Sequence, residues 1–91
     1  MTEAGATQLE ASDIDAVEWG RRLRDWRKLR DLSQVELAAR MSERLDQKIG
    51  QEVVSRWEQG KRLPTERQRI ALARILEVSV WGLFPYPPDV R

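Results

Sequence analysis

Apolar residues recur along this chain at the three- and four-residue intervals of amphipathic helices, and no segment alternates with the period of a strand. Five helical segments are predicted, at roughly residues 15–30, 34–45, 51–59, 65–76 and 80–84. Their apolar positions are Val17, Leu23, Trp26 and Leu29, then Leu37, Ala38, Met41 and Leu45, then Val53, Val54 and Trp57, then Ile70, Leu72, Ala73 and Leu76. The pattern predicts one compact all-α domain over residues 15–85, between a flexible acidic tail (1–14) and a C-terminal tail (86–91).

Residues that cap helices stand at the boundaries of these segments. Ser33–Glu36 and Thr65–Gln68 have the capping-box pattern, which predicts that a helix follows the first residue of each. Gly60 is suited to follow the third helix, because glycine enters the left-handed region freely. Ser79 is suited to cap the short last helix. The Ser12–Asp15 stretch would place acidic residues at the start of the first one.

Composition excludes several classes of function. The chain has no cysteine and no histidine, which removes disulfides, thiol chemistry, zinc-finger sites and imidazole bases. It also lacks a glycine-rich phosphate loop and a nucleophile elbow, so we expect neither an enzyme nor a cofactor or metal site. No apolar run approaches the length of a membrane span, and the first residues do not resemble a secretory signal. A cytoplasmic protein is therefore expected.

Charge is distributed unevenly along the chain. The formal net charge is only +1. Residues 1–18 hold five acidic residues and no basic one, a charge of −5, whereas residues 19–91 hold all the basic residues and carry +6. Basic residues are densest between Gly20 and Arg30. A basic body suits a polyanionic partner, although a solvated helix face is the alternative explanation of such a run.

Several short motifs occur in a characteristic order. They are Gly20-Arg21-Arg22-Leu23-Arg24, Trp26-Arg27, Leu32-Ser33-Gln34, Glu36-Leu37-Ala38, Val54-Ser55-Arg56-Trp57-Glu58-Gln59-Gly60, Leu72-Ala73-Arg74-Ile75-Leu76-Glu77-Val78-Ser79 and Leu83-Phe84. Over about residues 18–85 the chain thereby resembles the lambda-repressor-like, Cro/cI-type (XRE) helix-turn-helix family. The resemblance implies a five-helix fold whose second and third helices form the helix-turn-helix. It also implies a sequence-specific regulator of transcription, a repressor, that binds double-stranded DNA.

The resemblance further implies that the third helix reads base edges in the major groove with Gln51, Glu52, Ser55 and Arg56. The chemistry of these side chains agrees, since glutamine pairs with adenine, arginine with guanine, and glutamate accepts from cytosine. Glu52 has a second interpretation, in which it forms an ion pair with Lys48 or Arg56. For the whole set, an ordinary solvated helix face is the alternative.

Phosphate contacts are implied for Gln34, Lys61, Arg62, Lys48 and Arg24, and more weakly for Arg22. The positive end of the second helix supports the placement of Gln34, although Ser33 and Gln34 would also serve as caps alone. The family pairs the positions of Arg27 and Glu58, so a partly buried ion pair is expected there. Trp19, Trp26 and Trp57 are interpreted as core residues, not as platforms for stacking bases.

The chain departs from the family pattern between Met41 and Lys48, where the connection is longer than the usual short turn. Because Leu37, Met41 and Leu45 stay in phase, we expect the second helix to gain about one or two turns. Residues 46–50 then form the turn to the third helix, and Lys48 or Arg44 gains a phosphate contact. Asp31 replaces the common glycine after the first helix.

Members of this family mostly bind as dimers on palindromic sites, so a homodimer on DNA is implied. Its expected contact is the apolar end of the domain, comprising Val80, Trp81, Leu83, Phe84 and Tyr86. The alternative is that Trp81 and Phe84 close the domain's own core, which is the preferred interpretation for Phe84. The rival hypothesis is an antitoxin or adaptor whose main contact is a protein partner.

Overall fold

The computed structural model describes the backbone of residues 2–85 and the side chains of residues 16–85. Its helices are α1 (Thr2–Leu29), α2 (Gln34–Leu45), α3 (Gln51–Glu58), α4 (Glu66–Leu76) and α5 (Val80–Leu83). No strand occurs within residues 2–85, and the expected all-α architecture is confirmed. Within the same residues, no helix combines the length and apolar character needed to cross a membrane. The expectations for residues 86–91, including the contact by Tyr86, fall outside the described residues.

Local capping sets the ends of α2, α3 and α4. Ser33 Oγ accepts a hydrogen bond from Glu36 N at 3.0 Å, and Ser33 N donates to the Glu36 carboxylate at 2.8 Å. Thr65 and Gln68 form the same reciprocal pair before α4. Gly60 follows α3 with φ of 74°, the left-handed conformation that glycine adopts without strain. These three helices therefore begin and end within one residue of their predicted limits.

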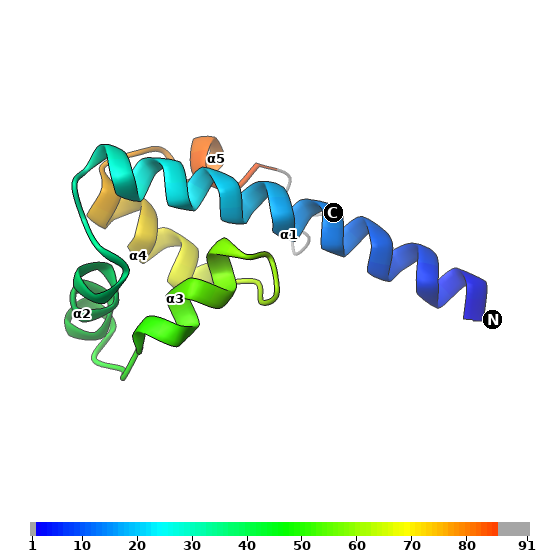
Figure 1. Cartoon of the computed structure of the whole chain (residues 1–91), viewed down its shortest axis with the longest axis horizontal. Coiled ribbons are helices and arrows are strands. Elements are labelled where there is room, and N and C mark those ends of the chain that lie inside the picture. The colour runs from blue at the N-terminus through cyan, green and yellow to red at the C-terminus, as the bar shows by residue number, and fades with distance from the viewer. Residues whose placement is uncertain (1, 86–91) are drawn as a thin grey trace.

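The start of α1 differs from the sequence prediction. The polar Ser12–Asp15 stretch predicts a helix start there, but α1 is continuous from Thr2 to Leu29, so that prediction is wrong. Alanine, leucine and glutamate, which favour helix, are frequent in residues 3–11, and no proline interrupts them. A serine or aspartate inside a helix costs only about 0.7 kcal/mol or less, which is too little to end it. The N-terminal half of α1 consequently projects from the body of the molecule (Figure 1).

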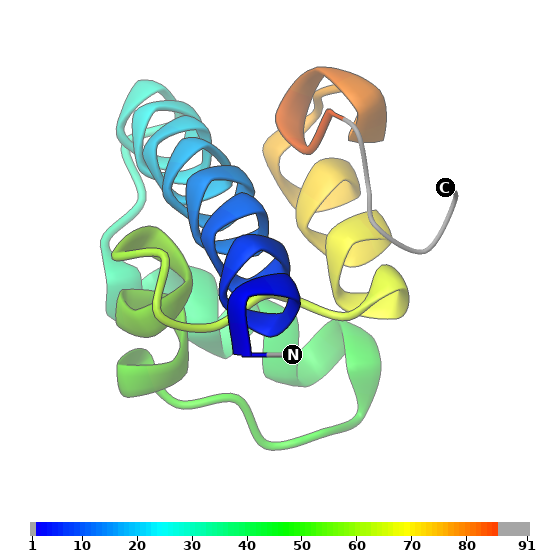
Figure 2. The ribbon, with the colours of Figure 1, turned by 90° about the vertical axis from the view of Figure 1, so that its right-hand side faces the viewer.

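The core lies where α1 packs against α3 and α5, and α2 packs against α3 and α4 (Figure 2). Its largest fully buried side chains are Trp19, Trp57, Phe84, Leu23, Leu37, Met41, Leu72, Leu76, Leu83 and Val54. The core assignment of Trp19 and Trp57 is thus confirmed, and Trp26 packs half-buried against the cluster. The assignment is wrong for Val17, Leu29 and Ile70, which are 58%, 64% and 43% exposed.

The two errors in α1 have a local cause. A Cβ placed on Gly60 would lie 2.9 Å from the Val17 Cα, so the main chain of α1, and not the valine side chain, faces the neighbouring loop. Leu29 is the last residue of α1 and lies next to the turn at Arg30 and Asp31, which carries the chain away to α2. Asp31 adopts the left-handed conformation with φ of 58°, which aspartate tolerates better than most residues.

The C-terminal end of the domain closes over α1. The Phe84 ring meets the Trp19 ring edge-on, with centroids 5.1 Å apart, and Trp19 Nε1 donates to the Pro85 carbonyl at 2.8 Å. Leu83 and Phe84 are buried in the domain's own core. The predicted dimer contact is therefore wrong for Leu83, and the preferred assignment of Phe84 to the core is confirmed. Trp81 remains 58% exposed.

Close packing of α1 on α3 depends on Gly20. A Cβ at this position would overlap the Glu58 carbonyl oxygen and lie 2.6 Å from that of Trp57, both of which belong to main chain that cannot rotate away. We predict that Gly20→Ala lowers the free energy of unfolding by about 1–3 kcal/mol, the cost of overpacking a core. Urea denaturation measures this change.

Gly82→Ala is the matched control, because its added methyl would meet nothing closer than 3.8 Å. Alanine also favours helix over glycine by up to about 1 kcal/mol, so this variant keeps or slightly raises stability. Equal destabilisation by the two substitutions would contradict the role assigned to Gly20.

Candidate nucleic-acid interface

The side chain of Ser42 holds the connection between α2 and α3 by hydrogen bonds. The Ser42 hydroxyl accepts a hydrogen bond from Ile49 N at 2.8 Å and lies 3.0 Å from the Ala38 and Ile49 carbonyl oxygens. Asp46 ends α2 in the left-handed conformation, and Ile49 is buried. Leu37, Met41 and Leu45 are all buried on one side of α2, which confirms their predicted phase. The connection between the two helices is therefore held at both ends.

The short helix α3 divides sharply into a buried and an outer side. Val54 and Trp57 are buried, and Val53 is partly so. Of the predicted base-reading residues, Gln51, Glu52 and Arg56 are exposed and Ser55 is half-buried. Ser55 Oγ accepts a hydrogen bond from Gln59 Nε2 at 2.7 Å. The outer side of α3 thus presents amide, hydroxyl, carboxylate and guanidinium groups together.

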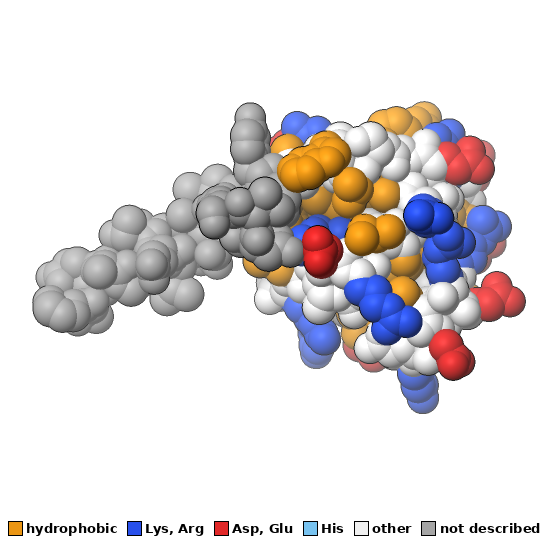
Figure 3. Space-filling model, turned by 180° about the vertical axis from the view of Figure 1, so that it is seen from behind, with side chains coloured by type: hydrophobic (Ala, Val, Ile, Leu, Met, Phe, Trp, Pro, Cys, Tyr) orange, Lys and Arg blue, Asp and Glu red, His pale blue; other side chains and the backbone are white. Residues whose placement is uncertain are grey.

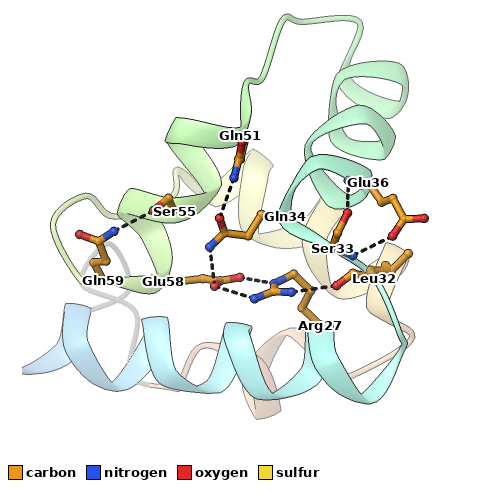
Figure 4. Close-up of polar contacts among 9 residues, drawn as sticks. All are labelled: Arg27, Leu32, Ser33, Gln34, Glu36, Gln51, Ser55, Glu58 and Gln59. Carbon is orange, nitrogen blue, oxygen red and sulfur yellow. Dashed lines mark hydrogen bonds and ion pairs between the residues drawn. The ribbon is translucent and has the colours of Figure 1, made fainter.

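A chain of hydrogen bonds joins the outer side of α3 to the start of α2 (Figure 4). Gln51 Nε2 donates to Gln34 Oε1 at 3.2 Å, and Gln34 Nε2 donates to Glu58 Oε1 at 3.0 Å. Gln34 thus accepts a hydrogen bond from Gln51 through its amide oxygen and donates one to Glu58 through its amide nitrogen. These two bonds fix the orientation of both glutamine amides. One predicted base reader and one predicted phosphate ligand are thereby brought together.

Glu58 also forms the ion pair predicted with Arg27. Arg27 Nε and Nη2 donate to the two carboxylate oxygens at 2.6 and 3.1 Å, and Arg27 Nη1 donates to the Leu32 carbonyl at 2.8 Å. The two side chains are only 11% and 4% exposed. This bidentate pair joins α1, the loop before α2 and the end of α3, and its prediction is confirmed.

A cleft opens beside Gln34, between α1, α2 and α3. It has a volume of about 370 Å³ and is lined by Arg24, Arg27, Lys28, Gln34, Ser55, Glu58 and Gln59. Arg24 and Gln34, two of the predicted phosphate ligands, therefore face the same space. Sequence reasoning missed Lys28, although its position four residues after Arg24 places both on one side of α1. The cleft has the size and the cationic rim to receive a phosphate group.

The remaining predicted cations lie at the surface. Lys48, Arg56, Lys61 and Arg62 are exposed, and the side chains of these four form no ion pair within residues 16–85. Lys48 lies in the turn before α3, whereas Lys61 and Arg62 follow its end. Arg44, the alternative to Lys48, instead lines hollows between α2 and α4.

One expectation about ion pairs is not met, and Arg22 has partners within the fold. Glu52 pairs with neither Lys48 nor Arg56 among the described side chains; its carboxylate lies over Gly50, where an added Cβ would be 2.6 Å from either oxygen. Arg22 donates to Glu18 at 2.7 Å and to the Gly82 carbonyl at 3.0 Å, so it braces α5 against α1. It is not among the residues that line the cleft.

Hydrogen bonding lowers the pKa of two carboxyl groups, those of the exposed Glu36 and the half-buried Glu18. The backbone N–H of Ser33, followed by its side chain, lowers the pKa of Glu36 at the start of α2. Hydrogen bonds from Arg21 and then Arg22 lower the pKa of Glu18. Each hydrogen-bonded carboxylate stabilises the fold at pH values above the ordinary pKa of glutamate. This stabilisation is lost as the pH falls through the lowered pKa of that carboxyl group. The Glu36 carboxylate, which belongs to the cap that positions Gln34, therefore stays charged at neutral pH.

The match of this chain to known families agrees with that geometry. A family model described as helix-turn-helix matches residues 23–80, which is more than half of the chain. No curated protein matches the chain, and no solved structure does. The matched region runs from the middle of α1 to the start of α5 and includes the whole of α2, α3 and the turn between them.

The Arg27–Glu58 pair supports a stability prediction. Glu58→Ala leaves a buried guanidinium without its carboxylate and takes away the acceptor of Gln34, so we expect a loss of about 3–5 kcal/mol in the free energy of unfolding. Guanidinium chloride denaturation measures the loss.

The control is the double variant Arg27→Met/Glu58→Leu, which replaces both charges by apolar groups and recovers most of that loss. If the double variant is as unstable as Glu58→Ala, the unpaired buried charge is not the cause.

Proposed function

The chain belongs to the Cro/cI-type (XRE) helix-turn-helix family, a family of DNA-binding regulators, and on that basis we propose that it is a sequence-specific repressor. In this proposal α3 enters the major groove of double-stranded DNA with its outer side toward the base edges. The observation that carries the proposal is the hydrogen-bonded set Gln51–Gln34–Glu58, which holds the outer side of α3 and the cationic cleft in one rigid arrangement.

The polar groups on α3 match the edges of bases. Arg56 has an exposed guanidinium that can donate two parallel hydrogen bonds to guanine O6 and N7. Gln51 uses its amide nitrogen toward Gln34, so its oxygen remains to accept from the exocyclic amine of adenine. Ser55 accepts from Gln59 and keeps its hydroxyl hydrogen for a base acceptor. Glu52 supplies an acceptor for cytosine N4.

Cations around α3 would hold the phosphate backbones. Arg24 and Lys28 border the cleft in which Gln34 lies. Lys48 precedes the start of α3, and Lys61 and Arg62 follow its end. These contacts position the protein on DNA without reading its sequence. Occupying an operator in this way excludes other proteins from the same DNA, which is sufficient for repression.

The division between base reading and phosphate contact can be tested by three substitutions. Arg56→Ala should weaken binding to the selected operator by about 1–3 kcal/mol and relax discrimination at one base pair. Arg56→Lys keeps the charge but loses the bidentate geometry, so it should lose specificity while keeping the salt dependence. Lys61→Ala should weaken binding to all sequences alike and reduce the salt slope by about one.

Titrations of operator and random DNA at several salt concentrations separate these effects. A fall of equal size on operator and random DNA for Arg56→Ala would exclude a base-reading role for Arg56.

A homodimer on DNA makes a further prediction. Selection of bound sequences from a random DNA pool should yield palindromes whose half-sites are about 10 base pairs apart, centre to centre, because two-fold symmetric proteins place two recognition helices one turn apart. Recovery of isolated single half-sites would show that one copy binds alone.

A further inference from the structure

A second basic surface lies between α2 and α4. Two adjoining hollows of about 500 and 210 Å³ form a shallow groove there, and Arg44 lines both of them. Neither hollow shares a lining residue with the cleft beside Gln34. Figure 3 shows the molecule from behind, where Lys and Arg side chains lie among hydrophobic, Asp and Glu side chains on the right-hand part of the body. The groove is therefore separate from the candidate DNA interface.

The groove combines positive charge with an apolar floor. Arg40 and Arg44 from α2 face Arg67 and Arg74 from α4, and the lining also includes one acidic residue, Glu43. None of the four exposed arginines forms an ion pair within residues 16–85. Between them lie Ile75 and Ile70, and the Ile70 side chain is 43% exposed although the α4 pattern predicts it on the apolar face. A DNA backbone offers only the small apolar surface of its sugars to such a floor, whereas an acidic amphipathic helix can offer larger apolar side chains beside its carboxylates.

The chain itself contains a segment of that chemistry. Glu3, Glu10, Asp13 and Asp15 precede the first basic residue, and Glu18 is already paired with Arg21 and Arg22. The spacing of Glu3, Glu10 and Asp13, seven and then three residues, is that of one side of a helix. Leu9 and Ile14 lie beside them in the sequence. Three acidic residues spaced along one side of the segment are thus available for a groove whose charged lining carries a net charge of +3.

This acidic segment cannot reach the groove of its own chain. Helix α1 is continuous through Leu29, and its N-terminal part projects away from the body on the side opposite α2 (Figure 1). We propose that the α2–α4 groove binds the acidic N-terminal part of α1 from a second copy of the chain. Two antiparallel copies each insert this segment into the groove of the other, which closes the assembly as a two-fold dimer.

The proposal requires no DNA, so it is tested on the full chain alone by sedimentation equilibrium. Wild-type protein should reach twice its mass of 10.6 kDa at low salt and dissociate as salt screens the charges. Arg44→Glu/Arg74→Glu should weaken association at least about tenfold, and Glu10→Arg/Asp13→Arg should do the same. Lys61→Glu/Arg62→Glu changes the charge by the same amount outside the groove and should leave the mass unchanged.

The decisive measurement mixes the two charge-reversed proteins. The groove variant keeps an acidic segment for the basic groove of its partner, and the segment variant offers a basic segment to the acidic groove. Both contacts are then complementary, so the mixture should form a dimer although neither protein does so alone. The mixture also distinguishes a loss of association from a loss of folding, because a misfolded variant would not form a dimer with the other protein.

Three outcomes would overturn the proposal. They are a wild-type chain that stays monomeric at low salt, a groove variant that keeps its dimer mass, and a mixture that does not associate. A groove variant that keeps its mass but binds random DNA more weakly would assign the arginines to nucleic acid instead. Because the sedimentation samples contain no DNA, the measured masses do not depend on whether α3 reads an operator.

Discussion

The carboxylate of Glu58 is the interaction on which the arrangement of the candidate interface depends. It accepts hydrogen bonds from Arg27 on α1 and from Gln34 on α2, while its own backbone ends α3. An isolated helix of eight residues is unstable in water, so α3 cannot hold its position by its own hydrogen bonds. One buried anion therefore sets the place of the end of α3 and of the first turn of α2, the two elements that would meet DNA.

The other end of α3 is positioned by different means. The Ser42 hydroxyl holds Ile49 close to α2, and Gly50 begins α3 without a side-chain cap. Near the C-terminal end, Gly20 lets the main chain of α1 lie directly against the Trp57 and Glu58 carbonyl groups. Because a methyl group at Gly20 would separate α1 from α3, it would also lengthen the Arg27–Glu58 contact. Packing and electrostatics at this site are thus coupled through one glycine.

The parts that could be predicted from sequence are those with local causes. The limits of α2 and α4 follow from Ser33 and Thr65 and the residue three positions after each, and so they were predictable. The start of α1 was not predictable in this way, because the Ser12–Asp15 stretch resembles a helix start although it lies inside a continuous helix. The partners of Glu52 and Arg22 also escaped prediction, since they depend on where α5 and the Gly50 backbone lie. Lys28 was missed because the cleft exists only once α1 crosses α2 and α3.

The net charge of +1 conceals a separation of charge that the fold enforces. A flexible acidic tail could fold back and neutralise the basic body, but a continuous helix holds residues 2–15 away from it. The acidic segment of the same chain consequently does not neutralise the basic side chains around α3 or those between α2 and α4, which can attract other molecules. The two surfaces differ in what lies between their cations, because polar amides separate those around α3 and isoleucine side chains separate those of the groove. Charge alone would draw both to any polyanion, so it is this neighbouring chemistry that favours base edges at one surface and an acidic helix at the other.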